Sequence, residues 1–216
     1  MAELDSNIKE LKSNKSAGSD NVLNEFIVHA PFSIRLLILT IFNNILTLEY
    51  FPECWALGGI VPIHKSGDKN IANNYRGITL LSCLGKLFTR VMNNRMTKWA
   101  DRYEKINETQ FGFRKGKGTT DCLFILHGLI ELLLEKGINL YVCFIDYQKA
   151  YDYLDRAALW SKLLKAGMSS KSIRLFRNMY AKMRLGIKGD DRSFKSDLGL
   201  LQGETCSPLF FFAVCK

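Results

Sequence analysis

The run of residues 140–146 (LYVCFID) constrains the fold of this chain more than any other segment. Six apolar or aromatic residues lead directly into a carboxylate, a pattern that favours a buried strand with Asp146 at its carboxyl-terminal edge. A carboxylate held in that position is rigid and partly desolvated, which suits it to bind a divalent metal ion. Taken alone, however, the run is explained more simply by an aspartate that ends a strand in a turn.

Size and charge narrow the class of protein. The chain has 216 residues, enough for one large domain or two small ones, and 47% of them are hydrophobic, which supports a packed core. Lys and Arg number 30 against 21 Asp and Glu, and the resulting charge of +9 indicates a polyanionic partner, most simply nucleic acid. A basic protein without such a partner is the open alternative. The longest apolar run, residues 36–42, is too short to cross a bilayer.

The cysteines do not follow a disulfide or zinc pattern. None belongs to a C-x-x-C pair, and no clustered histidines stand at zinc spacing. Together with the lack of a signal-peptide pattern, this predicts reduced, mostly buried thiols in an intracellular protein of the cytoplasm or nucleus. The cysteines are Cys54, Cys83, Cys122, Cys143, Cys206 and Cys215.

Hydrophobic periodicity and turn residues predict a mixed succession of helices and strands. Helices are expected to begin near Pro31, Thr79, Thr120 or Asp121, Asp155 and Ser170. Strands are expected over 56–63 and 76–78, and a hairpin is expected to join 183–188 to 193–200 through Gly189-Asp190-Asp191. Residues 1–20 are polar and are expected to be loosely ordered. Helices mixed with antiparallel strand pairs indicate an α+β fold.

Late in the chain, Gln202 and Gly203 lie in a segment whose composition suits a ligand-facing loop. A glycine after Gln202 lets the backbone approach a bound molecule closely. Ser207 followed by Pro208 predicts the N-cap and first residue of a helix, whose N-terminus can face an anion or a base. A plain capped turn explains these residues equally well.

Two other segments place cations where they could hold a polyanion. Arg114, Lys115 and Lys117 alternate with glycines after two aromatic residues, and such a loop could contact a nucleic-acid backbone. Lys65 and Arg76 lie on opposite arms of a predicted hairpin and could converge on a triphosphate, with the arginine offering a bidentate fork. A solvated loop and ordinary surface cations are the respective alternatives.

Taken in order, these segments resemble the reverse transcriptase domain of non-LTR (LINE-type) retrotransposons and, more distantly, the group II intron reverse transcriptases. The similarity runs from about Lys15 to Phe212, nearly the whole chain, and six separate pieces occur in the order of the family. The pieces are KSAGSD at 15–20, PIHKSGD at 62–68, NYRGITLL at 74–81, QFGFRKG at 110–116, the run ending at Asp146, and QG at 202–203 with SP at 207–208.

The resemblance implies roles at the reacting centre. Asp146 resembles the first metal-binding aspartate of the polymerase site, and the main-chain carbonyl of Tyr147 would be a further metal ligand. Tyr151 stands where the family places the aromatic ring that lies under the incoming sugar and rejects a 2′-hydroxyl group. Two Mg²⁺ ions are implied as cofactors, with dNTPs, an RNA template and a DNA primer as partners.

The same resemblance assigns the remaining site residues. Lys65 and Arg76 are similar to the fingers residues that grip the nucleotide phosphates. Gln202 and Gly203 match the loop that packs on the incoming nucleotide and the template. The residues that would follow the template strand are Arg114, Lys115 and Lys117.

The second acidic motif that the resemblance requires does not occur in the chain. The family supplies its other acids from a Tyr/Phe-x-Asp-Asp hairpin after the Gln-Gly loop, and no such sequence follows Gln202-Gly203. Gly189-Asp190-Asp191 precedes that loop and has the composition of an ordinary turn, so we do not expect it to substitute. Because one aspartate cannot fix two ions, the chain as it stands is expected to be inactive.

The expected organisation of the chain follows from these motifs. Residues 1–20 would be loosely ordered, residues 21–138 would form the fingers and the fingers-palm helices, and residues 139–216 would form an incomplete palm without a thumb. Phe210-Phe211-Phe212 would then be left exposed at the end of a truncated chain. The alternatives from other classes are a non-catalytic basic nucleic-acid-binding fragment and a decayed element with no selected function.

Overall fold

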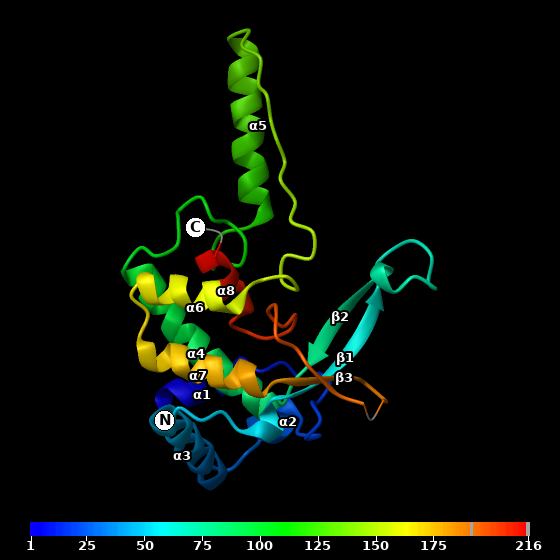
Figure 1. The fold of residues 1–216 in the computed structure, drawn as a ribbon. Helices are drawn as coiled ribbons and strands as arrows, with labels where there is room; N and C mark the ends of the chain where they lie inside the picture. The colour runs from blue at the N-terminus through cyan, green and yellow to red at the C-terminus, as the bar shows by residue number, and fades with distance from the viewer. Residues whose placement is uncertain (191, 215–216) are drawn as a thin grey trace.

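Helices of different lengths lie to one side of one small sheet in the computed structural model, which describes residues 1–190 and 192–214, and the β1–β2 hairpin of that sheet extends away from them (Figure 1). This arrangement confirms the α+β class expected from the sequence. The strands are β1 (Leu57–His64), β2 (Tyr75–Leu80), β3 (Arg184–Ile187) and β4 (Phe194–Lys195). The helices are α1 (Ala2–Lys9), α2 (Asn24–Val28), α3 (Phe32–Leu48), α4 (Cys83–Arg102), α5 (Thr119–Glu135), α6 (Arg156–Lys165), α7 (Ser170–Lys182) and α8 (Ser207–Val214), with short 3-10 turns η1 (Glu53–Trp55) and η2 (Ala72–Asn74).

The four strands form one sheet in the order β2-β1-β3-β4. β1 and β2 make an antiparallel hairpin in which Ile63 lies opposite Arg76, as the predicted strands require. β1 pairs in parallel with β3, and β3 pairs antiparallel with β4, which confirms the second predicted hairpin. Asp191, which was expected in the turn of that hairpin, lies outside the described residues. The sheet therefore brings an early hairpin of the chain beside a late one.

The core is centred on α4, α6 and α7, which pack together with α1, α3 and α8 in one continuous apolar cluster. Leu87 and Phe88 of α4 and Phe176 and Tyr180 of α7 are almost completely buried. The ring of Phe88 lies 5.2 Å from that of Phe42 on α3, in the edge-to-face arrangement that aromatic rings prefer. This ring contact joins α3 to α4 within the core.

The N-terminal segment is more ordered than its polar composition suggested. Residues 2–9 form α1, and Leu4 and Ile8 are buried in the core. Asn7 is buried as well; its amide donates to a carbonyl of its own helix and accepts from Asn94 of α4. The expectation of loose order over 1–20 is therefore wrong for this helix, because two apolar residues four positions apart share the face that meets α4.

Two helices begin at residues other than those predicted. Ser82 caps α4 by accepting a backbone N–H of its first turn, whereas Thr79 belongs to β2. α5 follows Gly118, whose N–H donates to the carboxylate of Asp121 at 2.7 Å. Asp155 caps α6 as predicted. Both errors are small shifts along the chain, and Thr79 cannot cap α4 because it pairs with Ile60 in the first hairpin.

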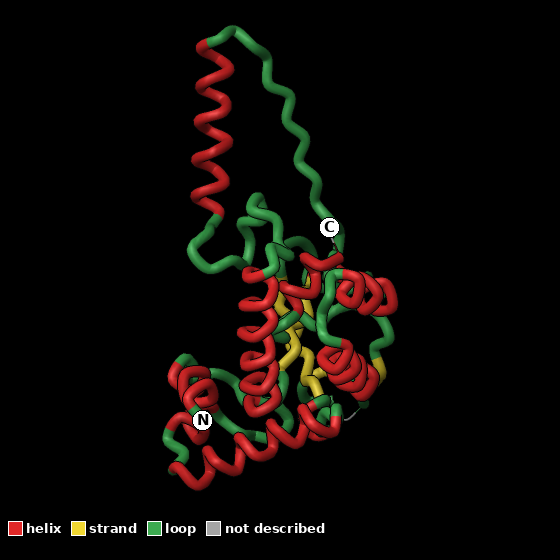
Figure 2. The backbone as a smooth tube through the Cα atoms, turned by 90° about the vertical axis from the view of Figure 1, so that its left-hand side faces the viewer, coloured by secondary structure: helices red, strands yellow, loops and turns green. Residues whose placement is uncertain are grey.

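A long arm projects from one end of the molecule (Figures 1 and 2). It consists of α5 and the extended segment 136–147 that returns beside it, and we call these two parts the projecting arm. Residues 140–146 are not a strand: within the described chain no backbone hydrogen bond involves 139–147, and Tyr141 and Phe144 are 90% and 83% exposed. The expectation of a buried strand ending at Asp146 is therefore wrong here, because an extended run becomes a strand only beside a hydrogen-bonding partner.

The phenylalanines of α8 also differ from expectation. Phe210 is completely buried between α6 and α7, and Phe211 stacks on Tyr151. Phe212 is half-buried beside Phe113. The three residues are not left exposed, because aromatic side chains of the same chain supply the surfaces that cover them.

The thiols are distributed differently from the prediction. Cys83 and Cys206 are buried, whereas Cys54, Cys122 and Cys143 are exposed, so the five described cysteines are not mostly buried. Two of the exposed thiols lie on the projecting arm. In the described part of the chain, including the apolar helix α5, no helix is both long and apolar enough to cross a membrane.

Candidate functional site

The turn at residues 199–204, which we call the Gln-Gly turn, lies where three parts of the fold meet. On one side it rests on β2, where the N–H of Thr79 donates to the carbonyl of Gln202 at 2.9 Å. On the other side the N–H of Leu200 donates to the carbonyl of Tyr151 at 2.7 Å. Beyond the turn the chain enters α8. Gln202 is thereby held between β2 and the loop 147–154.

Gly203 is required in this turn for two reasons. Its φ is +112°, a backbone conformation that only glycine adopts readily. A methyl group added to it would also lie 2.8 Å from the carbonyl oxygen of Thr79, too close for any side chain. In the structure this close approach is made to β2, and the approach to a bound molecule expected from the sequence stays a prediction.

Tyr151 and Gln202 belong to the same neighbourhood. The Nε2 atom of Gln202 lies 3.3 Å from Oδ1 of Asp152, and the ring of Tyr151 stacks on a phenylalanine of α8 at 5.2 Å between centroids. Lys149 extends the loop toward the first hairpin, where its Nζ donates to Oδ1 of Asn73 at 3.1 Å. The structure thus gathers Tyr151, Gln202 and Gly203 and links their loop to the segment that precedes β2.

Lys65 and Arg76 are carried by the β1–β2 hairpin. Arg76 lies on β2, three residues before Thr79, and Lys65 follows the last residue of β1. The N–H of Lys65 donates to the carbonyl of Asn74 at 2.9 Å, which fixes the backbone at this end of the hairpin. Both side chains are exposed and form no hydrogen bond or ion pair with another described residue. Their charges are therefore available to a ligand.

Asp146 and Tyr147 lie at the base of the projecting arm, and both are exposed. Among the described residues, no three His, Cys, Asp or Glu side chains gather as a metal site. One exposed carboxylate and one main-chain carbonyl do not form a donor set that could fix two Mg²⁺ ions. The residues present therefore do not complete the expected two-metal site, and Asp146 is connected to the Gln-Gly turn only through loop 147–154.

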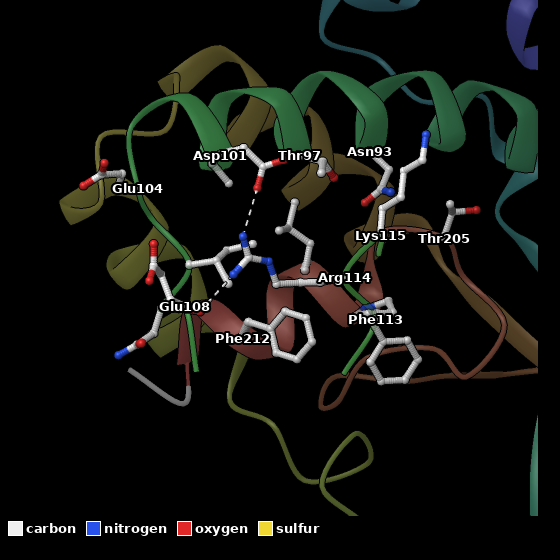
Figure 3. A pocket seen from close by; sticks show the side chains of 15 residues that line it. Asn93, Thr97, Asp101, Glu104, Glu108, Phe113, Arg114, Lys115, Thr205 and Phe212 are labelled. Atoms are coloured by element: carbon white, nitrogen blue, oxygen red, sulfur yellow. Dashed lines mark hydrogen bonds and ion pairs between the residues drawn. The ribbon is translucent and has the colours of Figure 1, made fainter. Parts of the chain in front are cut away.

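Arg114 lines a cavity of about 840 Å³ between α4, the loop before α5 and the start of α8 (Figure 3). Its guanidinium group lies 3.8 Å from the carboxylate of Asp101 and donates to the carbonyl of Asn107 at 3.1 Å. Figure 3 shows Arg114 directed toward Asp101, with Lys115 on the same cavity. Arg114 thus links its own loop to Asp101 and Asn107, a structural role that the sequence pattern did not indicate.

Lys117 is also engaged within this loop. Its Nζ atom donates to the carbonyl of Glu108 and lies 5.1 Å from the centroid of the Phe111 ring, close enough for a cation–π contact. Lys115 is exposed and has no such contact with a described residue. Of the three cations predicted to follow a template, Lys115 is therefore the one that presents its charge to the cavity and the solvent.

Two buried charged residues near the Gln-Gly turn were missed by sequence reasoning. The guanidinium group of Arg156 donates to the carbonyls of Gly199, Ser196 and Leu198 at 2.5 to 2.9 Å, and it thereby holds the segment that leads into the turn. Glu204 lies inside the turn and is 4% exposed. The only signal for Glu204 was an acid in otherwise apolar surroundings, and Arg156 carried no signal beyond its place after a capping aspartate.

Comparison with known proteins identifies the family of this chain. Residues 63–215 match the family model described as reverse transcriptase (RNA-dependent DNA polymerase). The chain belongs to the reverse transcriptase family. This reverse transcriptase domain is 35% identical, over 73% of its own length and 18% of the relative, to a probable RNA-directed DNA polymerase from transposon BS of Drosophila melanogaster. It is 29% identical to the RNA-directed DNA polymerase from mobile element jockey of Drosophila funebris, over 98% of this chain and 23% of that relative.

The relatives are RNA-directed DNA polymerases of non-LTR retrotransposons, the group that the sequence motifs resembled. A third, a probable RNA-directed DNA polymerase from transposon X-element of Drosophila melanogaster, is 29% identical over 92% of this chain and 22% of its own length. The resemblance is therefore confirmed at the level of the family. The reverse transcriptase domain spans about a fifth of the length of these relatives.

Proposed function

We propose that this chain is part of an RNA-directed DNA polymerase of a non-LTR retrotransposon. Residues 21–138 would form its fingers and the helices that lead to the palm, and residues 139–216 would form part of the palm. The observation that carries the proposal is the position of the Gln-Gly turn, held between β2 and loop 147–154. Three motifs that lie far apart in the sequence meet at that place, as a nucleotide site built from them requires.

In the proposed reaction, the 3′-hydroxyl of a DNA primer on an RNA template displaces pyrophosphate from a dNTP. Lys65 and Arg76 would hold the phosphates, since both cations are exposed and unpaired among the described residues. Tyr151, whose ring is fixed by its stack in α8, would lie under the sugar. Gln202 would pack on the nucleotide. Asp146 would supply one carboxylate toward Mg²⁺ ions, which neutralise charge on the phosphates in such a polymerase.

We further propose that the 216-residue chain does not polymerise by itself. Asp146 is exposed, and the described residues do not gather the further acids that a two-metal site needs. Primer extension on an RNA template, with Mg²⁺ and dNTPs, tests this directly. We expect no extension above background. Extension that disappears in Asp146→Ala would show that the chain is an active polymerase and that this part of the proposal is wrong.

Nucleotide binding can be tested separately from turnover. If Lys65 and Arg76 hold the phosphates, Lys65→Ala and Arg76→Ala should each weaken dNTP binding about tenfold, or roughly 1.4 kcal/mol. Lys12→Ala removes an exposed lysine of the N-terminal segment and serves as the matched control. Equal effects of all three substitutions would show only a general loss of positive charge and would count against a phosphate site on the hairpin.

A second candidate function is nucleic-acid binding without catalysis. The charge of +9 and the unpaired Lys115 at the edge of the cavity favour it. Because backbone binding releases counterions, affinity for RNA should fall steeply with salt, and Lys115→Ala should reduce the slope by about one. Affinity that does not change with salt would exclude this function.

A further inference from the structure

Glu204 is a buried carboxyl group in the middle of the Gln-Gly turn. It directly follows Gly203 and is 4% exposed, and no other acidic residue in the described chain is buried to this extent. Acidic side chains are rarely buried unless they satisfy a specific set of partners. None of the roles proposed above for substrate binding uses this residue.

One oxygen of Glu204 joins the turn to the first residues of α8. Its Oε2 accepts from the N–H of Cys206 at 2.8 Å and lies 3.4 Å from Oγ of Ser207. The same Ser207 hydroxyl donates to the carbonyl of Leu201 at 2.9 Å. The carboxyl group and the hydroxyl therefore bridge the two ends of the segment that contains Gln202 and Gly203.

Behind this bridge, two helices of the core fix its position. The thiol of Cys206 donates to the carbonyl of Thr89 on α4 at 3.3 Å, and the hydroxyl of Tyr180 on α7 lies 3.5 Å from Oγ of Ser207. The second oxygen, Oε1, makes no hydrogen bond of normal geometry with a described residue. A buried carboxyl group is unfavourable unless specific contacts compensate for its burial, and Oε2 makes two such contacts, with the Cys206 N–H and the Ser207 hydroxyl.

The same turn also contacts β2. The Thr79 N–H bond to Gln202 and the contact of Gly203 with the Thr79 carbonyl both depend on the path of the turn. A shift of the turn would break this bond and move Gln202 away from Asp152. The conformation that Glu204 stabilises is thus the one that joins α8 to the hairpin carrying Arg76.

We infer that Glu204 is a positioning residue whose carboxyl group, through Cys206 N–H and Ser207, holds Gln202 and Gly203 against β2. The importance of this position for nucleotide binding rests on the proposed function, but the positioning itself does not. A carboxamide could keep the acceptor oxygen, whereas a shorter acid or an alanine could not reach the Cys206 N–H. Reach and acceptor geometry, rather than charge, should therefore decide the outcome.

Amide hydrogen exchange on the whole chain tests the inference. In Glu204→Ala, exchange at Thr79 and in residues 199–206 should become about tenfold faster relative to the interior of α4, because the local bond is lost without global unfolding. Glu204→Asp should behave in the same way, and Glu204→Gln should stay within about threefold of the unsubstituted chain. Asn7→Ala is the matched control, since it removes a buried polar group remote from the turn.

The outcomes separate positioning from general stability and from nucleotide binding. Unchanged relative exchange at Thr79 in Glu204→Ala, or the same change in Asn7→Ala, would overturn the inference. Failure of both Glu204→Ala and Glu204→Asp to fold would also overturn it, because the residue would then serve the core as a whole. Faster local exchange with no dNTP binding by any variant would support positioning and count against the proposed nucleotide site.

Discussion

Phe210 provides the most direct test of how α8 is held. Its side chain is 0% exposed, and its ring lies 4.9 Å from Phe176 and 5.7 Å from Trp160, both edge-to-face. Truncating a buried phenylalanine to alanine costs about 3–5 kcal/mol, and two aromatic contacts of this kind place Phe210→Ala near ~4 kcal/mol. A loss of that size is a large fraction of the roughly 5–15 kcal/mol that stabilises a typical domain.

Urea denaturation followed by far-UV circular dichroism measures this loss. With a slope of about 2.5 kcal/mol per molar urea, the midpoint should fall by about 1.5 M while the slope stays unchanged. Phe212→Ala, a half-buried residue of the same helix, should cost only about 1 kcal/mol. A loss below ~1 kcal/mol for Phe210→Ala would refute the packing described for α8. A single cooperative transition of the unsubstituted chain would also count against a decayed, poorly folded fragment.

Three further predictions concern the turn and the projecting arm. Burial raises the pKa of Glu204, so the folded state keeps its proton to higher pH than the unfolded state. The stabilisation present below pH ~4.5 is therefore lost as the pH rises through the folded pKa. Glu204→Gln lacks this titration and should gain stability relative to the unsubstituted chain as the pH rises above ~4.5, and parallel stability curves would contradict this. Gly203→Ala should lower the free energy of unfolding, measured by thermal unfolding, by about 1–3 kcal/mol. Gly116→Ala should lower it less, because the φ of Gly116 is also positive but its added methyl group would meet no atom within 4 Å. Equal losses would show that the close approach to Thr79 is unimportant. Phe144 and Ile145 expose apolar side chains on the arm, so the double substitution Phe144→Lys and Ile145→Lys should lower concentration-dependent self-association, measured by light scattering. Unchanged self-association would show that another surface mediates it.

Local patterns were sufficient to predict most of the helices and strands. The periodicity after Pro31, the cap at Asp155 and the strands of the first hairpin all correspond to elements of the structure. Gly203 was expected to let the backbone approach a bound molecule, which stays a prediction, and in the structure its close approach is to β2. These features depend on residues that are near in sequence or on backbone conformations that few residue types allow.

The errors arose where an apolar pattern was interpreted without knowing its partner. The run before Asp146 has a strand composition, but pairing needs a second strand, and none of the described strands lies beside it. The reverse error concerned Phe210, which was expected to be exposed although α6 and α7 supply aromatic partners for it. Arg114 shows the same limit for charge, because the composition of its loop did not reveal that Asp101 and Asn107 would engage it.

The parallel pairing of β1 with β3 has a consequence for how the chain acquires its fold during synthesis. The backbone N–H of Phe51, just before β1, donates to the side chain of Asn178, 127 positions later. A ribosome making about 5–20 residues per second would complete β1 many seconds before β3 leaves the exit tunnel. Throughout that interval one edge of β1 stays unpaired, so a nascent chain is open to wrong strand partners until its last third has been made.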